Sequence, residues 1–170
     1  HREPTSLTYS NRSGDASVQL ERLLGSGAFS SVYALKEPGE TFLKTPKSHR
    51  CVKALENEAE ALKAFDHTCI PKVFLEDAPH LGILTVQLLC DKSKLPSLRL
   101  KGLIGTPASK VKVKDLNSSY LQHIIDDIMS ALKHAHARGW VHLDVRPSNI
   151  IISQPGNVSP RVQLIDFGCA

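Results

Sequence analysis

The stretch His142-Leu143-Asp144-Val145-Arg146-Pro147-Ser148-Asn149 decides how this chain is interpreted, together with two motifs on either side of it. Downstream lies Asp166-Phe167-Gly168, and far upstream lies Gly25-Ser26-Gly27-Ala28-Phe29-Ser30. A glycine-rich turn lets the backbone approach phosphate groups closely, because no side chain stands at the contact points. Carboxylate and amide oxygens on the two later motifs are ligands that suit Mg²⁺. The three motifs, in this order, indicate chemistry on a phosphate group.

The composition places few restrictions on this interpretation. The chain has 170 residues, of which 41% are hydrophobic and 22% charged, as in an ordinary globular domain. Its net charge of +4 is mild, and no basic patch is interleaved with aromatic residues, so we expect no nucleic-acid partner. No apolar run is long enough to cross a bilayer, so we expect no membrane partner. Nothing in the sequence predicts the oligomeric state.

The cysteines favour a reducing compartment. Cys51, Cys69, Cys90 and Cys169 form no C-x-x-C pair, which fits free thiols better than a disulfide framework or a zinc site. We therefore expect an intracellular protein, cytoplasmic or nuclear. Because the chain begins with His1, an additional targeting segment before it stays an open alternative.

Hydrophobic periodicity predicts a strand-rich first part and a more helical second part. Residues 1–17 are polar and are expected to be a leader or linker. Residues 91–114, rich in Lys and Ser, are expected to be loop with short elements. We predict strands near 18–24, 32–35, 41–44, 72–75, 82–89, 150–152 and 162–165, and helices over 52–65 and from 115 or 117 to about Gly139.

Lys44 and Glu58 are candidate partners in the first part. Lys44 lies in the strand that follows the glycine-rich hairpin, and Glu58 lies on the next helix. Lys36 is the rival lysine, but it follows Val32 too closely to cross a hairpin. The alternatives are a solvated surface lysine and, for Gly25-Ser26-Gly27, an ordinary turn, since Ser30 replaces the third glycine of G-x-G-x-x-G.

Asp144, Arg146, Asn149 and Asp166 are the candidates in the second part. An aspartate within reach of a hydroxyl can orient it and accept its proton. A cation at Arg146 can meet the charge of a phosphate, and Asn149 with Asp166 can hold Mg²⁺. The alternative is an ordinary polar turn, which does not explain the long helix before it and the strand after it.

Together, these motifs resemble a eukaryotic-type protein kinase of the Ser/Thr kind over roughly residues 18–170, ending just after D-F-G. The resemblance implies an α+β fold, with a small antiparallel N-lobe sheet and one helix over 18–89. Residues 90–170 would then form the segment after the hinge and the start of a helical C-lobe. It also implies ATP and Mg²⁺ as cofactors and a protein as substrate.

The resemblance also assigns roles to residues. Catalytic roles fall to Asp144, Lys44, Glu58 and Arg146, and Mg²⁺ ligation to Asn149 and Asp166. Gln87-Leu88-Leu89 would be the hinge between the lobes, with Val86 as gatekeeper, and a regulatory spine would comprise Leu62, Val73, His142 and Phe167. The nucleotide contacts implied are Gly25, Gly27, Phe29, Val32, Lys44, Gln87, Leu89 and Ile151.

Several departures from the family pattern keep other functions open. Leu143 replaces the arginine of H-R-D, and Phe42 replaces the small residue that packs over adenine. The missing activation segment predicts an inactive fragment with the α-helical face at Leu121, Ile125, Ile128 and Leu132 only partly covered. The alternatives are a pseudokinase or binding module that keeps the fold, and a small-molecule phosphotransferase of the aminoglycoside or choline kinase type.

Overall fold

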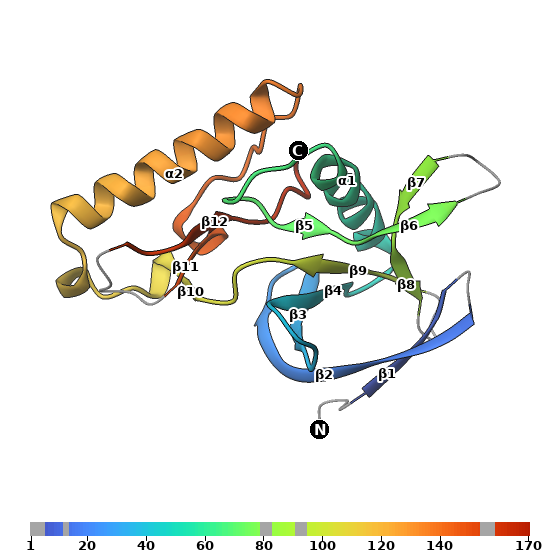
Figure 1. The fold of residues 1–170 in the computed structure, drawn as a ribbon. Helices are drawn as coiled ribbons and strands as arrows, with labels where there is room; N and C mark the ends of the chain where they lie inside the picture. The colour runs from blue at the N-terminus through green and yellow to red at the C-terminus, as the bar shows by residue number, and fades with distance from the viewer. Residues whose placement is uncertain (1–5, 12–13, 79–82, 91–94, 154–158) are drawn as a thin grey trace. The chain divides into compact units, whose positions relative to one another are not determined.

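The computed structural model describes all residues except 1–5, 12–13, 79–82, 91–94 and 154–158. Two compact units divide the chain between them, and Figure 1 shows the elements of each. The first unit comprises His1–Glu60 and Val73–Lys101, and the second comprises Ala61–Lys72 and Gly102–Ala170. No helix in the described ranges is long and apolar enough to cross a bilayer.

The first unit is built on an antiparallel sheet with the strand order β4-β3-β2-β1-β8-β9-β5, in which β4 also pairs with β9. A separate hairpin pairs β6 with β7. The strands are β1 Ser6–Asn11, β2 Gly14–Ser26, β3 Ser30–Leu35, β4 Thr41–Pro46, β5 Lys72–Val73, β6 Leu75–Ala78, β7 Ile83–Val86, β8 Leu88–Cys90 and β9 Pro96–Lys101. The short 3₁₀ turn η1 His49–Cys51 leads into the helix α1 Val52–Lys63.

Apolar residues of four strands form the core of this sheet. Val18, Leu20, Leu35, Leu43 and Leu89 are all buried and pack together. Because side chains alternate along a strand, Leu43 points to this core while its neighbours on β4 point to the opposite face. Burial of each such side chain contributes about 1.5–3 kcal/mol, so the cluster fixes the register of β4.

One sequence expectation about the first unit is corrected by the strand pairing. Residues 1–17 were expected to be leader or linker, yet β1 pairs antiparallel with β2 from Ser6↔Gln19 to Asn11↔Gly14. The stretch 91–114 contains short elements as expected, and one of them, β9, pairs with β4 from Thr41↔Lys101 to Lys44↔Leu98. A strand that pairs on both edges gains its stability from partners distant in sequence, which a local polar composition does not reveal.

The second unit consists of a long helix and a small sheet (Figure 1). The antiparallel sheet has the order β10-β11-β12, and α2 packs against β12. Its elements are β10 Thr106–Pro107, the 3₁₀ turns η2 Ala108–Lys110 and η3 Val113–Asp115, α2 Ser118–His136, the 3₁₀ turn η4 Pro147–Asn149, β11 Ile150–Ile152 and β12 Val162–Leu164.

Helix α2 begins and ends where its sequence predicts. The Asn117 side chain caps it by accepting a hydrogen bond from the Tyr120 N–H at 2.8 Å. After the last turn, Gly139 adopts a φ of 80°, which favours glycine. The buried face repeats at steps of three and four residues, and its members are Tyr120, Ile124, Ile128, Ala131 and Ala135.

The outer face of α2 carries exposed apolar side chains. Leu121, Ile125 and Met129 are 41%, 53% and 47% exposed. The expectation of an uncovered apolar face is therefore right for Leu121 and Ile125 but wrong for Ile128, which is buried. The reason is the helical period of 3.6, which turns Ile128 toward β12 and leaves Met129 outside.

Gly105 is fixed by packing in this unit. A Cβ atom added there would lie 2.4 Å from the Ile152 carbonyl oxygen. No side chain fits at that distance, so only glycine lets the chain enter β10 beside β11.

Candidate active site

The glycine-rich loop is the turn of the β2–β3 hairpin. The Gly27 N–H donates to the Ser30 carbonyl at 2.9 Å, which closes the turn, and the Phe29 ring is 64% exposed at its tip. Val32 lies opposite Gly25 on one side and Lys44 on the other, so the hairpin carries the glycines and the lysine strand in one register.

The fold itself does not require glycine at Gly25 or Gly27. A Cβ atom at Gly25 would meet nothing within 4 Å, and one at Gly27 would meet only the Ser30 carbonyl oxygen at 4.0 Å. Neither has a positive φ, unlike Gly39 and Gly139. Open space outside a bare backbone fits the close approach of phosphate groups, whose oxygens accept from backbone N–H groups.

Lys44 and Glu58 form a buried ion pair within the first unit. The Lys44 Nζ lies 2.5 Å from Glu58 Oε2, and the two side chains are only 11% and 4% exposed. Strand β4 supplies the lysine and α1 supplies the glutamate. Because a buried charge needs a partner, the pair holds the ammonium in one place. Lys36, the rival lysine, is exposed.

Asp144 and Asn149 are joined directly on the loop that precedes β11. The Asn149 Nδ2 donates to the Asp144 carbonyl at 2.9 Å and to its carboxylate Oδ2 at 3.0 Å. Arg146 Nε lies 3.4 Å from the same Oδ2. Because the amide nitrogen of Asn149 faces Asp144, Oδ1 is the atom of this side chain that suits a cation.

His142 connects this loop to the strand end before Asp166. Its Nδ1 accepts from the Asp144 N–H at 3.1 Å, which leaves the ring proton on Nε2, and that N–H donates to the Ile165 carbonyl at 2.9 Å. The ring also contacts Phe167 edge to face, with centroids 4.5 Å apart. His142 and Phe167 are both fully buried, so the neutral imidazole acts as a fixed spacer between the two motifs.

Asp166 is held next to Asn149 through the backbone. The Ile165 N–H donates to the Asn149 carbonyl at 2.9 Å. The start of β11 after Asn149 and the end of β12 before Asp166 are thus joined, which brings the two predicted metal ligands close together along the backbone. Asp166 has a φ of 69° and Leu143 a φ of 64°. A left-handed backbone at a non-glycine residue costs about 1–3 kcal/mol and is found most often at functional sites.

The donor set fits Mg²⁺ when phosphates complete it. Among the described residues, no group of three or more His, Cys, Asp and Glu side chains could hold a metal ion. Mg²⁺ is commonly held by one or two carboxylates together with phosphate oxygens and water. Asp166 and Asn149 have the carboxylate and amide oxygens that a site of this kind would use.

Comparison with known families identifies this arrangement. A family model described as a protein kinase domain matches residues 18–170, which is most of the chain. The chain belongs to the protein kinase family. This confirms the resemblance drawn from the three motifs, and the antiparallel sheet with one helix followed by α2 confirms the expected α+β kinase fold.

Individual protein kinases are similar over most of the chain. Serine/threonine-protein kinase dkf-1 of Caenorhabditis elegans is 26% identical over 159 residues, 90% of this chain and 21% of that protein. Serine/threonine-protein kinase Pkn1 of Myxococcus xanthus is 28% identical over 162 residues, 91% of this chain and 22% of that protein. Mitosis inhibitor protein kinase wee1 of Schizosaccharomyces pombe is 28% identical over 185 residues, 98% of this chain and 19% of that protein. The chain thus spans about a fifth of the length of these kinases.

The division between the two compact units differs from the expected boundary at 89/90. Besides residues 61–72, the second unit begins at Gly102, so residues 90–101 belong to the first unit. Leu89 is 2% exposed and belongs to the core of the sheet. The Gln87 N–H donates to the Phe74 carbonyl at 2.8 Å within the first unit. The hinge and nucleotide-binding roles expected for Gln87 and Leu89 stay predictions.

The expected boundary lay at 89/90 because the apolar run at 82–89 resembles the last strand of a first lobe. The strand that actually pairs with the lysine strand is β9, where Leu98 faces Lys44 and Leu100 faces Phe42. The alternation of Leu98 and Leu100, followed by Gly102, is the signal that could have found it. Ile151 lies in β11 opposite Gln163 and is half-buried.

Phe65 contacts the D-F-G phenylalanine but received no role from the sequence. Its ring packs on the Phe167 ring with centroids 5.1 Å apart. Leu62, one turn earlier, is 1% exposed. The ring of Phe167, the D-F-G phenylalanine, is therefore in contact with the rings of both Phe65 and His142.

Proposed function

We propose that the protein containing this chain is an ATP-dependent protein kinase that phosphorylates serine or threonine. The observation that carries the proposal is the hydrogen bond from Asn149 to the Asp144 carboxylate. His142 connects the same loop to Ile165, the residue before Asp166, through a second hydrogen bond. This arrangement supports roles for Asp144 as proton acceptor and for Asn149 and Asp166 as Mg²⁺ ligands, because hydrogen bonds connect the parts of the chain that carry them. Membership of the kinase family and similarity to proteins named as Ser/Thr kinases agree with it.

Each residue has a distinct task in the proposed reaction. Bound Mg²⁺–ATP would supply the phosphoryl group. The Asp144 carboxylate orients the substrate hydroxyl and accepts its proton. We assign the proton to Oδ1 of Asp144, because Asn149 and Arg146 both face the other oxygen, Oδ2. Arg146 adds positive charge beside the Asp144 carboxylate, and this charge would stabilise the negative charge of the transferred phosphate. Lys44, fixed by Glu58, offers its ammonium to phosphate oxygens.

The test is phosphate transfer by the full-length protein. We expect Asp144→Asn to lower kcat at least a hundredfold while nucleotide binding stays within about threefold of wild type, because loss of a general base usually costs 10²–10⁴-fold. Asp126→Asn, at an exposed carboxylate on α2, is the matched control. Labelled ATP should label a Ser/Thr peptide but neither an aminoglycoside nor choline. Undiminished transfer by Asp144→Asn would exclude this carboxylate as the base.

A non-catalytic pseudokinase is the second candidate, and Phe42 is the observation that favours it. This ring is 8% exposed on β4, two residues before Lys44 and on the same face of the strand. The family places a small residue there, so the ring takes volume that a nucleotide would otherwise use. Failure of the wild type to bind ATP, with binding gained in Phe42→Ala, would support this second function.

We further propose that the protein acts inside the cell, in the cytoplasm or nucleus. The support is chemical, since Cys51, Cys69, Cys90 and Cys169 are all free thiols. Imaging of the full-length protein tests this proposal.

A further inference from the structure

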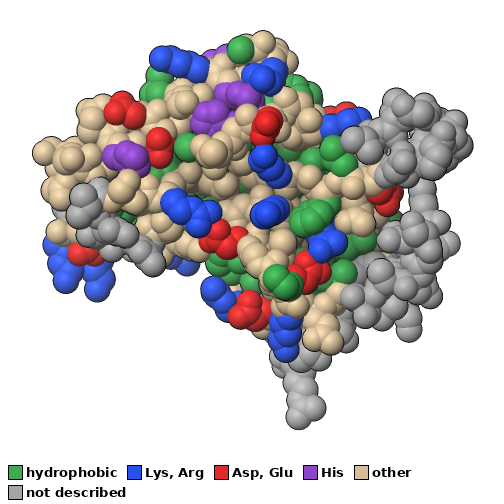
Figure 2. Space-filling view, in the orientation of Figure 1, with side chains coloured by type: hydrophobic (Ala, Val, Ile, Leu, Met, Phe, Trp, Pro, Cys, Tyr) green, Lys and Arg blue, Asp and Glu red, His purple; other side chains and the backbone are tan. Residues whose placement is uncertain are grey.

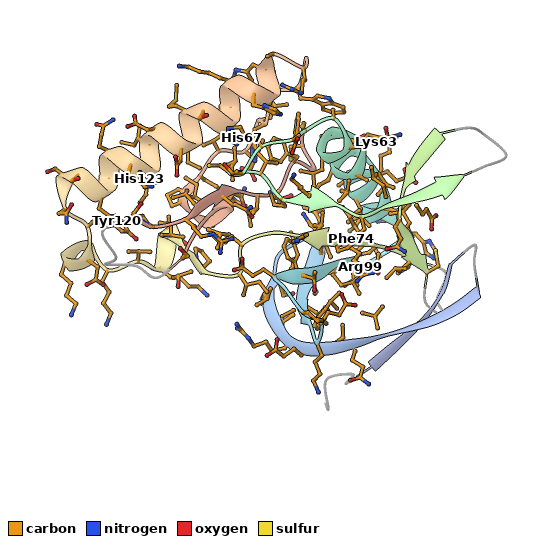
Figure 3. All side chains as sticks on the ribbon, in the orientation of Figure 1. Lys63, His67, Phe74, Arg99, Tyr120 and His123 are labelled. Carbon is orange, nitrogen blue, oxygen red and sulfur yellow. The ribbon has the colours of Figure 1, made fainter. Side chains whose placement is uncertain are left out.

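The segment 64–71, which joins α1 to β5, is held on α2 by hydrogen bonds that involve two histidine rings. His134 on α2 accepts the Asp66 N–H at its Nε2, 3.1 Å away. His67 in the segment reaches Ser130 on α2, with Nε2 and Oγ 3.0 Å apart. The two rings lie 5.1 Å apart between centroids. Figure 3 shows His67 beside α2, and Figure 2 shows histidine side chains gathered on this face.

Both rings must be neutral for these hydrogen bonds to exist. Nδ1 of His67 accepts the Cys69 N–H at 3.1 Å, so its proton sits on Nε2 and is donated to Ser130. A backbone amide is only a donor, so Nε2 of His134 must likewise carry a lone pair toward Asp66. Protonation converts either acceptor nitrogen into a donor, which breaks its bond to the backbone.

The charged groups around the rings come from three elements. The segment supplies Asp66, the turn after α2 supplies Arg138, and β5 supplies Lys72, whose Nζ lies 2.6 Å from Asp66 Oδ1. Arg138 Nη1 lies 3.2 Å from His134 Nδ1 and donates to the His134 carbonyl at 3.1 Å. Lys72 holds the pKa of Asp66 below its usual range, so this carboxylate stays charged. Because the Asp66 carboxylate already pairs with Lys72, it favours the protonated form of His134 only in part.

The balance favours neutral His134. Burial, then the Arg138 guanidinium, then the His67 ring lower the pKa of His134 from its ordinary value, and only the Asp66 carboxylate opposes them. A second positive ring 5.1 Å away would also be unfavourable, since like charges at that distance repel.

The segment also supports the strand that leads to Asp166. The Cys69 carbonyl accepts the Leu164 N–H at 2.8 Å, and the Thr68 carbonyl accepts Gln163 Nε2 at 3.0 Å. Phe65, at the start of the segment, packs on Phe167. A change that loosens the segment from α2 would therefore loosen supports of β12 and of Phe167.

We infer that His67 and His134 form a pH-sensitive clasp, which holds residues 64–71 on α2 while His134 is neutral and loosens when His134 is protonated. The clasp is distinct from the proposed phosphate transfer and does not depend on it. The sign follows from linkage: His134 binds a proton less readily in the folded state than in the unfolded state. Its contribution to stability is present above the ordinary histidine pKa of about 6.5 and is lost as pH falls through the lowered folded value.

Hydrogen exchange measured by mass spectrometry on the full-length protein tests the clasp. Protection of the peptide spanning 64–71 is measured from pH 5 to pH 8 and corrected for the intrinsic exchange rate. Between the ordinary histidine pKa of about 6.5 and the lowered folded value, we expect wild-type protection to fall by up to about tenfold per pH unit, the slope for one bound proton, and to level off at lower pH. A peptide from β3 serves as the internal reference.

Two variants separate titration from packing. His134→Gln keeps an acceptor for the Asp66 N–H but cannot titrate, so its protection at 64–71 should change much less with pH. His136→Gln, at an exposed histidine on the same helix, should follow wild type. If His134→Gln does not fold, ring titration of the wild type by NMR replaces it, and loss of protection must follow that titration. Constant wild-type protection, an equal loss in β3, or a His134→Gln profile like wild type would each overturn the clasp.

Discussion

At the scale of the residue, the pairing of Lys44 with Glu58 shows how a charge can be kept inside a small sheet. The ammonium and carboxylate are 2.5 Å apart and nearly inaccessible to water. Desolvation of two charges is costly, and such pairs often add little net stability compared with apolar residues. The small net stability expected of the pair agrees with the proposed role of the Lys44 ammonium in binding a phosphate.

The removal of one partner should be costly for the same reason. We expect Glu58→Gln to lower the free energy of unfolding by about 3–5 kcal/mol, because the Lys44 charge stays buried without its carboxylate. Urea unfolding followed by circular dichroism measures this. Glu56→Gln, at a more exposed position of the same helix, should stay within about 0.5 kcal/mol of wild type. The double variant Lys44→Met/Glu58→Leu should lose less than Glu58→Gln, and a larger loss would contradict the argument.

At the scale of the element, α2 is the part whose sequence is most consistent with its structure. Its cap, its buried face and its final glycine all agree with a helix over Ser118–His136. The helix also provides the side chains that anchor other elements, with His134 and Ser130 facing the segment 64–71 and His123 Nε2 lying 3.0 Å from the Pro160 carbonyl. A stable α2 is therefore a condition for the arrangement of the catalytic loop that follows it.

The cap at Asn117 should contribute measurably to that stability. We expect Asn117→Ala to cost about 1 kcal/mol, because the Tyr120 N–H loses its acceptor at the first turn. Asn117→Asp keeps an oxygen at the same place and should retain most of the stability. Both are measured as changes in the free energy of unfolding in urea. Equal losses in the two variants would show that the cap hydrogen bond is not the cause.

At the scale of the whole molecule, the residues proposed to handle the nucleotide come from both compact units. Lys44 and Glu58 belong to the first, and Asp144, Asn149 and Asp166 belong to the second. The ion pair joins Lys44 to Glu58 inside the first unit, and the His142 hydrogen bonds join Asp144 to Ile165 inside the second. A ligand that binds the folded protein stabilises it by mass action, so binding of the proposed nucleotide should raise the free energy of unfolding.

We expect Mg²⁺–ATP at one hundred times its dissociation constant to stabilise the full-length protein by about 2.7 kcal/mol. Thermal unfolding with and without the nucleotide measures this shift. Asp166→Asn should lose the part that depends on Mg²⁺, because it removes a carboxylate ligand, whereas Asp144→Asn should keep the shift. A wild type without any shift would contradict ATP binding and favour the pseudokinase.

The sequence alone determined what local patterns can specify. The loop from His142 to Asn149, the glycine-rich hairpin and α2 depend on residues that are close in the chain, so their spacing and periodicity were enough to predict them. The partnership of Lys44 with Glu58 was also predictable, because it follows from one strand and the next helix.

Only the tertiary structure decided which distant segments meet. The placement of β9 beside β4, the burial of Leu89 in the sheet core and the hairpin of β1 with β2 all depend on strand partners that no local period encodes. The contact between His67 and His134 likewise joins a loop to a helix far along the chain. The physical reason is that a backbone group or an apolar side chain can take its partner from any segment that folding brings near it. The spacing of residues along the sequence does not say which segment that will be.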